Sequence, residues 1–128
     1  MVNKQVSDWL TAAEYDLQTA QAMLETKRYL YVTFMCQQTI EKTLKAIYAH
    51  KKNEIPPRTH NLLYLVDALQ VTMPDPDKEF LGELNQFYLG GRYPGKINEL
   101  AKAIDQNKAV YYLDKTRGVQ QCLKQMLP

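Results

Sequence analysis

The chain has 128 residues, the size of a single domain, and we expect one compact unit spanning residues 1–128. Hydrophobic residues make up 45% of the chain and charged residues 23%, which excludes a disordered or fibrous protein. The 16 basic and 14 acidic side chains leave a net charge of +2, too small for binding nucleic acid through bulk charge alone.

Cysteine usage and the lack of long apolar runs indicate the compartment. The 2 cysteines, Cys36 and Cys122, fall inside helical patterns and are interpreted as buried thiols rather than a disulfide framework. The N-terminus has no apolar stretch that would make a secretory signal. The longest near-apolar run, Leu30 to Cys36, is far shorter than the roughly 20 residues that a membrane helix needs. We therefore expect a cytoplasmic protein.

Apolar residues recur at helical spacing along the chain, and no stretch alternates as a strand would. The pattern predicts an all-α fold, an up-and-down bundle of about five helices. These helices are expected over residues 7–28, 29–50, 59–73, 75–88 and 105–127. Between the last two we expect an irregular stretch at 92–95, with a short helical turn around residues 98–103.

Residues with known positional preferences mark the helix ends. Ser7, Thr59 and Asp105 are predicted N-caps, because a short polar side chain can accept hydrogen bonds from the free amides of a helix start. Gly90-Gly91 is predicted to end the fourth helix, because glycine adopts the left-handed conformation of a helix cap without strain.

A polar stripe runs along the second helix beside its core stripe, which is predicted to be Val32, Cys36, Ile40, Leu44 and Ile47. The members of the polar stripe are Gln38, Glu41, Lys42 and Lys45, with Gln37 adjacent. One interpretation is a solvated face with a Glu41–Lys45 pair at i,i+4. The other is the wall of a ligand-binding groove. Spacing alone favours the solvated face.

The segment from Lys42 to His60 is locally basic. Its charged side chains are Lys42, Lys45, Lys51, Lys52 and Arg58 against Glu54. Such an excess attracts anions, and in part it is the cationic end that a helix C-terminus prefers. His60 is expected either to serve the start of the third helix or to contact a ligand.

The loop Arg92-Tyr93-Pro94-Gly95 follows a pair of glycines. Arginine can form a two-pronged contact to a phosphate, and a tyrosine ring can stack on a base. The alternative is that Arg92 caps exposed carbonyls while Tyr93 packs on the bundle. The sequence leaves both open.

Other kinds of site are disfavoured. The 2 histidines, His50 and His60, lie ten residues apart across a proline-containing loop without a carboxylate pattern, so we expect no metal. No glycine motif of a phosphate-binding loop is present, and we expect no cofactor. Cys36 lies on an apolar stripe, where a thiol is usually inert.

Four stretches resemble the HEPN domain family of small bacterial and archaeal helical proteins. They are Trp9-x-x-x-Ala13-x-x-Asp16-Leu17-x-x-Ala20, the run from Cys36 to Ala46, Thr59-His60-Asn61-Leu62, and Arg92-Tyr93-Pro94. They occur in this order at the matching helical positions, and together they cover nearly the whole chain.

The resemblance implies a helical bundle that forms a homodimer and acts beside a minimal nucleotidyltransferase, as its nucleotide- or substrate-binding partner in a toxin–antitoxin pair. Many family members are ribonucleases, whose signature is an arginine followed after four to six residues by a histidine. No arginine precedes His50 or His60 at that interval, and no histidine follows Arg92. Ribonuclease activity is therefore not expected.

We expect a non-catalytic binding module that takes a nucleotide, a nucleotidyltransferase partner, or both, with RNA a less favoured ligand. The expected contacts line one groove and are Lys42, Lys45, His60, Arg92 and Tyr93. One alternative is an RNA-cleaving toxin with an atypical pair such as His60 and Arg92. Another is a structural interaction subunit without a ligand.

The last helix also favours a homodimer. Besides its inner face it carries Val110, Tyr111, Val119 and Met126 on other sides. This is more apolar surface than packing on one core face requires.

Overall fold

The computed structural model describes residues 4–128, and all regular structure within them is helical. The helices are α1 (Lys4–Glu25), α2 (Tyr29–Lys52), α3 (Leu62–Leu69), α4 (Asp75–Asn85), α5 (Pro94–Ala103) and α6 (Gln106–Lys124). The all-α prediction is confirmed. The first three residues of the N-terminus, on which the expectation about a secretory signal partly depends, lie outside the described part of the chain.

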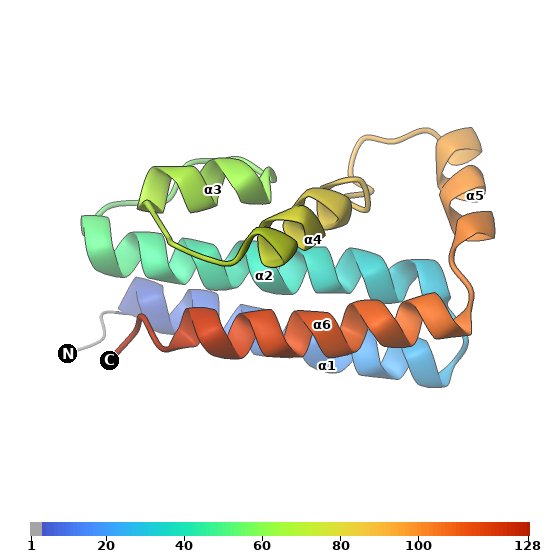
Figure 1. Ribbon diagram of the computed structural model, residues 1–128, viewed down its shortest axis with the longest axis horizontal. Coiled ribbons are helices and arrows are strands. Elements are labelled where there is room, and N and C mark those ends of the chain that lie inside the picture. The colour runs from blue at the N-terminus through green and yellow to red at the C-terminus, as the bar shows by residue number, and fades with distance from the viewer. Residues whose placement is uncertain (1–3) are drawn as a thin grey trace.

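Helix α2 is the centre of the bundle. It packs against α1 along one side and α6 along another, while α3 and α4 lie together over a third side (Figure 1). Its predicted core stripe has no exposed surface at all: Val32, Cys36, Ile40, Leu44 and Ile47. Burying aliphatic side chains on several sides of one helix is the main source of the free energy that stabilises this fold.

The segment after α4 forms one more helix than the pattern predicted. Residues 94–103 make a complete helix, α5, instead of a loop with a short turn. Pro94 stands in its first turn, where a missing N–H costs nothing. Leu100 is the buried residue of α5, which explains the weak apolar periodicity. The helix lies across one end of the bundle (Figure 1).

The N-cap predictions have mixed outcomes. Asp105 caps α6 as expected, accepting a hydrogen bond from the Lys108 amide at 2.9 Å. Helix α1 already includes residue 4, so Ser7 lies inside it. Thr59 is not the cap of α3; that residue is Asn61, whose side chain accepts from the amides of Leu63 and Tyr64.

The fourth helix is shorter than predicted, and the glycine pair does not cap it. Helix α4 ends at Asn85 and is followed by Gln86 in a right-handed conformation. Gly91 does have a positive φ of 77°, but it serves a turn in which the Arg92 amide donates to the Leu89 carbonyl at 3.2 Å. Phe87 and Leu89 are buried beyond the helix end, which made the apolar pattern look longer.

The surplus apolar surface of the last helix is smaller than its sequence indicated. Val119 is buried in the core, and Met126 packs against it. Val110 and Tyr111 remain partly exposed, at 37% and 51%. No helix within residues 4–128 is long and apolar enough to span a membrane.

Asn61 is predicted to be a strong local determinant of stability. Its Oδ1 accepts from two α3 amides and from Asn85 Nδ2 at 3.0 Å, while Asn85 Oδ1 accepts from the Leu62 amide at 2.9 Å. Asn61→Ala removes this cap and should lower the free energy of unfolding by about 1–2 kcal/mol in urea titrations.

Thr59→Ala is the matched control. Thr59 Oγ1 accepts a single hydrogen bond, from the Asn61 amide at 3.1 Å. Its loss should cost clearly less, and equal effects of the two variants would contradict the assignment of Asn61 as the cap.

Candidate functional site

The polar stripe of α2 is not a solvated face. Gln37, Glu41 and Lys45 are buried, with 0%, 3% and 6% of their surface exposed. A charged side chain at such depth requires a partner, because removing it from water is costly. The predicted Glu41–Lys45 pair provides it, with Lys45 Nζ 3.0 Å from Glu41 Oε2.

Glu41 also binds groups from outside the ion pair. Its second oxygen, Oε1, lies 2.9 Å from His60 Nδ1 and accepts a hydrogen bond from Gln37 Nε2 at 3.2 Å. Gln37 Nε2 also donates to the backbone carbonyl of His60 at 2.9 Å. Both side chains of α2 thus fix residue 60, which stands two residues before α3.

Helix α1 covers Lys45, the second residue of the ion pair. The Lys45 ammonium lies 5.4 Å from the centre of the Trp9 ring, in the geometry of a cation–π contact. The charge of Lys45 is therefore neutralised by Glu41 and shielded by an aromatic ring.

The ring of His60 stacks on Tyr88. The two ring centres lie 3.8 Å apart with an interplanar angle of 14°. Gly90 makes this position possible, because a Cβ at residue 90 would collide with the Tyr88 hydroxyl and ring. The connection between α4 and α5 therefore places an aromatic ring directly over the start of α3.

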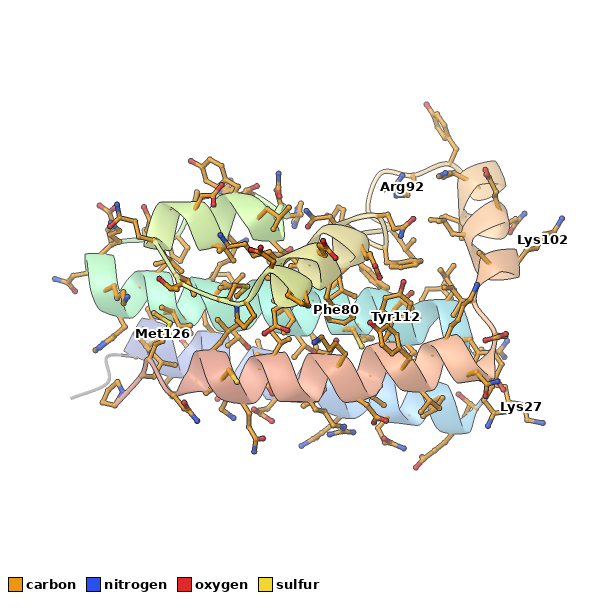
Figure 2. The ribbon with its side chains drawn as sticks, viewed as in Figure 1. Lys27, Phe80, Arg92, Lys102, Tyr112 and Met126 are labelled. Carbon is orange, nitrogen blue, oxygen red and sulfur yellow. The ribbon has the colours of Figure 1, made fainter. Side chains whose placement is uncertain are left out.

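Arg92 reaches the same tyrosine through the backbone. Its Nε donates to the Tyr88 carbonyl at 2.8 Å. Figure 2 shows Arg92 on the connection between α4 and α5, on the side of α2 that carries α3 and α4. The two terminal nitrogens of Arg92 have no recorded hydrogen bond or ion pair within residues 4–128. We refer to His60, Tyr88 and Arg92, over the buried Glu41–Lys45 pair, as the His60 site.

The side chains of the other two predicted contact residues, Lys42 and Tyr93, form no hydrogen bond or ion pair with this site within residues 4–128. Lys42 turns to α1 and forms an ion pair with Asp16, with 2.6 Å between Nζ and Oδ2. An open depression of about 320 Å³ lies beside this pair, lined mainly by α1. Tyr93 is 84% exposed. Within residues 4–128 no hydrogen bond or ion pair joins Arg92 to Lys42, Lys45 or His60, and the contacts of His60 and Arg92 meet at Tyr88.

The two cysteines differ. Burial raises the pKa of Cys36 to about 12, so its thiol stays protonated at neutral pH. This agrees with the interpretation of Cys36 as inert packing. Cys122 is exposed, in contrast to the prediction, because it lies on the solvent side of α6. Both are free thiols.

The His60 site has the parts of a small anion-binding site. Within the described residues no group of three metal-ligating side chains is found. An arginine with free terminal nitrogens can donate to a phosphate, and an imidazole whose second nitrogen points away from its carboxylate can do so when the ring is protonated.

Sequence reasoning missed Tyr88 as part of the site. The sequence did hold one signal, which is the position of this tyrosine two residues before a glycine pair, at the end of the predicted fourth helix. A polar aromatic side chain at such a position is not needed for the core. Sequence reasoning also did not pair Glu41 with His60, because this contact joins residues that are 19 positions apart.

Comparisons with known proteins agree with one another. The family model described as "HEPN domain" matches residues 6–126. Among solved structures, the chain is similar to TT1696 from Thermus thermophilus, with a TM-score of 0.81 and 25% identity over 98% of this chain and 100% of that one. It also has the fold of ST0689, an archaeal HEPN homologue, with a TM-score of 0.73 and 23% identity over the same shares. No curated protein matches the chain.

Proposed function

The chain belongs to the HEPN domain family, and we propose that within it this protein is a non-catalytic module that binds a nucleotide through the phosphate at the His60 site. The observation that carries the proposal is that two side chains able to bind a phosphate both contact Tyr88. His60 stacks on the Tyr88 ring, and Arg92 donates to the Tyr88 carbonyl, although the two residues come from different connections.

The charge at the site supports a phosphate as the ligand. Lys45 is neutralised by Glu41 and Lys42 by Asp16, so these two lysines add no free charge. Arg92 forms no ion pair within residues 4–128, and its terminal nitrogens are left for a ligand. A guanidinium fork matches two oxygens of one phosphate, which a lysine ammonium cannot do.

The cellular setting of the proposal follows from the resemblance described above. A minimal nucleotidyltransferase is the proposed protein partner, within a toxin–antitoxin pair. We place the protein in the cytoplasm, because both of its cysteines are free thiols.

Arg92→Ala tests the proposed site. With ATP as the probe in calorimetric titrations, loss of one charge-assisted contact of about 1.5–3 kcal/mol should weaken binding by about 10- to 100-fold. The melting temperature should fall only slightly, because the variant loses a single hydrogen bond to a loop carbonyl.

Arg117→Ala removes the same charge elsewhere. Arg117 is exposed on α6 and donates to Gln21 at 3.0 Å. This control should leave ATP affinity unchanged. If both variants weaken binding equally, the effect comes from overall charge and the site is wrongly assigned.

An RNA-cleaving activity is the second candidate function, and one contact favours it. An imidazole oriented by a buried carboxylate is the arrangement of a general base, as His60 and Glu41 have it. The family's spacing of arginine and histidine is nevertheless absent from the sequence.

We predict that the purified protein does not cleave RNA without added metal. Cleavage of a phosphodiester needs a proton acceptor, a proton donor and a cation near the phosphate, and His60 alone cannot fill the first two roles at once. Total RNA incubated with the protein and resolved on a gel should stay intact. Cleavage that disappears in His60→Ala would establish the enzyme instead.

We also propose that the protein is a homodimer. Exposed aromatic side chains on separate helices support this, with Tyr15 71% exposed on α1 and Tyr111 51% exposed on α6. Light scattering at micromolar concentration should give about twice the monomer mass of 14.9 kDa. A mass equal to that of the monomer would contradict the proposal.

A further inference from the structure

The contact with Glu41 determines which nitrogen of the His60 ring carries the hydrogen. Nδ1 lies 2.9 Å from Glu41 Oε1, and the other oxygen of Glu41 is paired with Lys45. An ionised carboxylate accepts hydrogen bonds and donates none, so Nδ1 must carry the hydrogen. Nε2 is therefore the nitrogen at which the imidazole gains or loses its charge.

Nε2 is available to a ligand. The side chain of His60 is 48% exposed, and within residues 4–128 the structure records no hydrogen bond to Nε2. In the neutral ring this nitrogen presents a lone pair, which repels an anion, whereas in the protonated ring it donates a hydrogen bond. An anion placed at His60 thus requires the charged ring.

The net charge of the groups around His60 depends on whether Nε2 carries a proton. The titratable and charged groups that contact the His60 site are Glu41 and Lys45 from α2, and Tyr88 and Arg92 from the connection between α4 and α5. Arg58, two residues earlier in the chain, is exposed and forms no hydrogen bond or ion pair with His60 within residues 4–128. Glu41 and Lys45 cancel. The cluster around Tyr88 therefore gains a second positive charge beside Arg92 only when His60 is protonated.

We propose that a phosphate-bearing anion binding at the His60 site takes up one proton at Nε2, so that its affinity rises as the pH falls. This inference rests on the proposed function and states how the same site is regulated. Histidine is the side chain whose charge ordinarily changes between about pH 5 and pH 8. Glu41 acts as a positioning residue, because its carboxylate holds Nδ1 and turns Nε2 outward.

The dissociation constant of ATP, measured by calorimetry from about pH 6 to about pH 8, tests the linkage. Uptake of one proton on binding weakens affinity by up to about tenfold for each pH unit of increase. In His60→Gln the side-chain amide can still donate but does not titrate, so the only pH dependence left should be that of the ATP phosphates, which take up a proton at about pH 6. His50→Gln is the matched control, because His50 is exposed near the end of α2, and it should keep the slope of the unmodified protein.

A second measurement separates this inference from the proposed function. Pyrophosphate, added during an NMR pH titration of both imidazoles, should raise the pH midpoint of His60 and leave that of His50 in place. ATP binding with the same pH dependence in His60→Gln as in the unmodified protein would overturn the proton linkage and leave nucleotide binding standing. No ATP binding, together with a raised His60 midpoint in pyrophosphate, would overturn nucleotide binding and leave the linkage standing. If neither occurs, both are wrong.

Discussion

The carboxylate of Glu41 is the constraint on which the rest of the site depends. It is 3% exposed in the middle of the central helix, and a charge at that depth must be fully paired. One oxygen takes Lys45 and the other takes His60 and Gln37. Each of these contacts fixes a different part of the molecule, because Lys45 lies under Trp9 of α1 and His60 stands at the entry to α3.

A buried ion pair is weak evidence for stability, since its desolvation can cost more than its attraction returns. The aliphatic core of α2 stabilises the bundle without it, through residues such as Ile40 and Leu44 that have no exposed surface. The burial of the polar stripe therefore needs an explanation other than stability. Its physical effect is to fix the orientation of one imidazole at the surface, and a fixed donor loses less entropy on binding a ligand than a free one.

The sequence was sufficient for the three long helices, α1, α2 and α6, and for the inner face of α2, because an apolar residue every three or four positions has few other interpretations. It failed where burial continued beyond a helix. Phe87 and Leu89 extend the apolar pattern of α4 although the helix ends at Asn85. It also failed at α5, whose single buried residue, Leu100, leaves no periodicity to detect. At the candidate site, Lys42 and Lys45 were both counted among the cations of one groove, although the spacing had already indicated Glu41 as the partner of Lys45. The partner of Lys42, Asp16, could not be predicted, because it depends on how α1 packs on α2.

Pairing of these lysines changes what the site can do. A groove lined by permanent cations would attract any polyanion, RNA included, with an affinity set largely by salt. The His60 site has instead one permanent cation, Arg92, and one imidazole whose charge depends on its surroundings. Two donors around one tyrosine match the few oxygens of a terminal phosphate better than an extended backbone, which requires many contacts in a row. The small number of functional groups also argues against RNA cleavage. One imidazole held by a carboxylate supplies a single proton-transfer group, whereas the reaction needs two. Because most charges in this bundle are paired internally, the site favours binding of a small phosphate ligand over cleavage of an RNA chain.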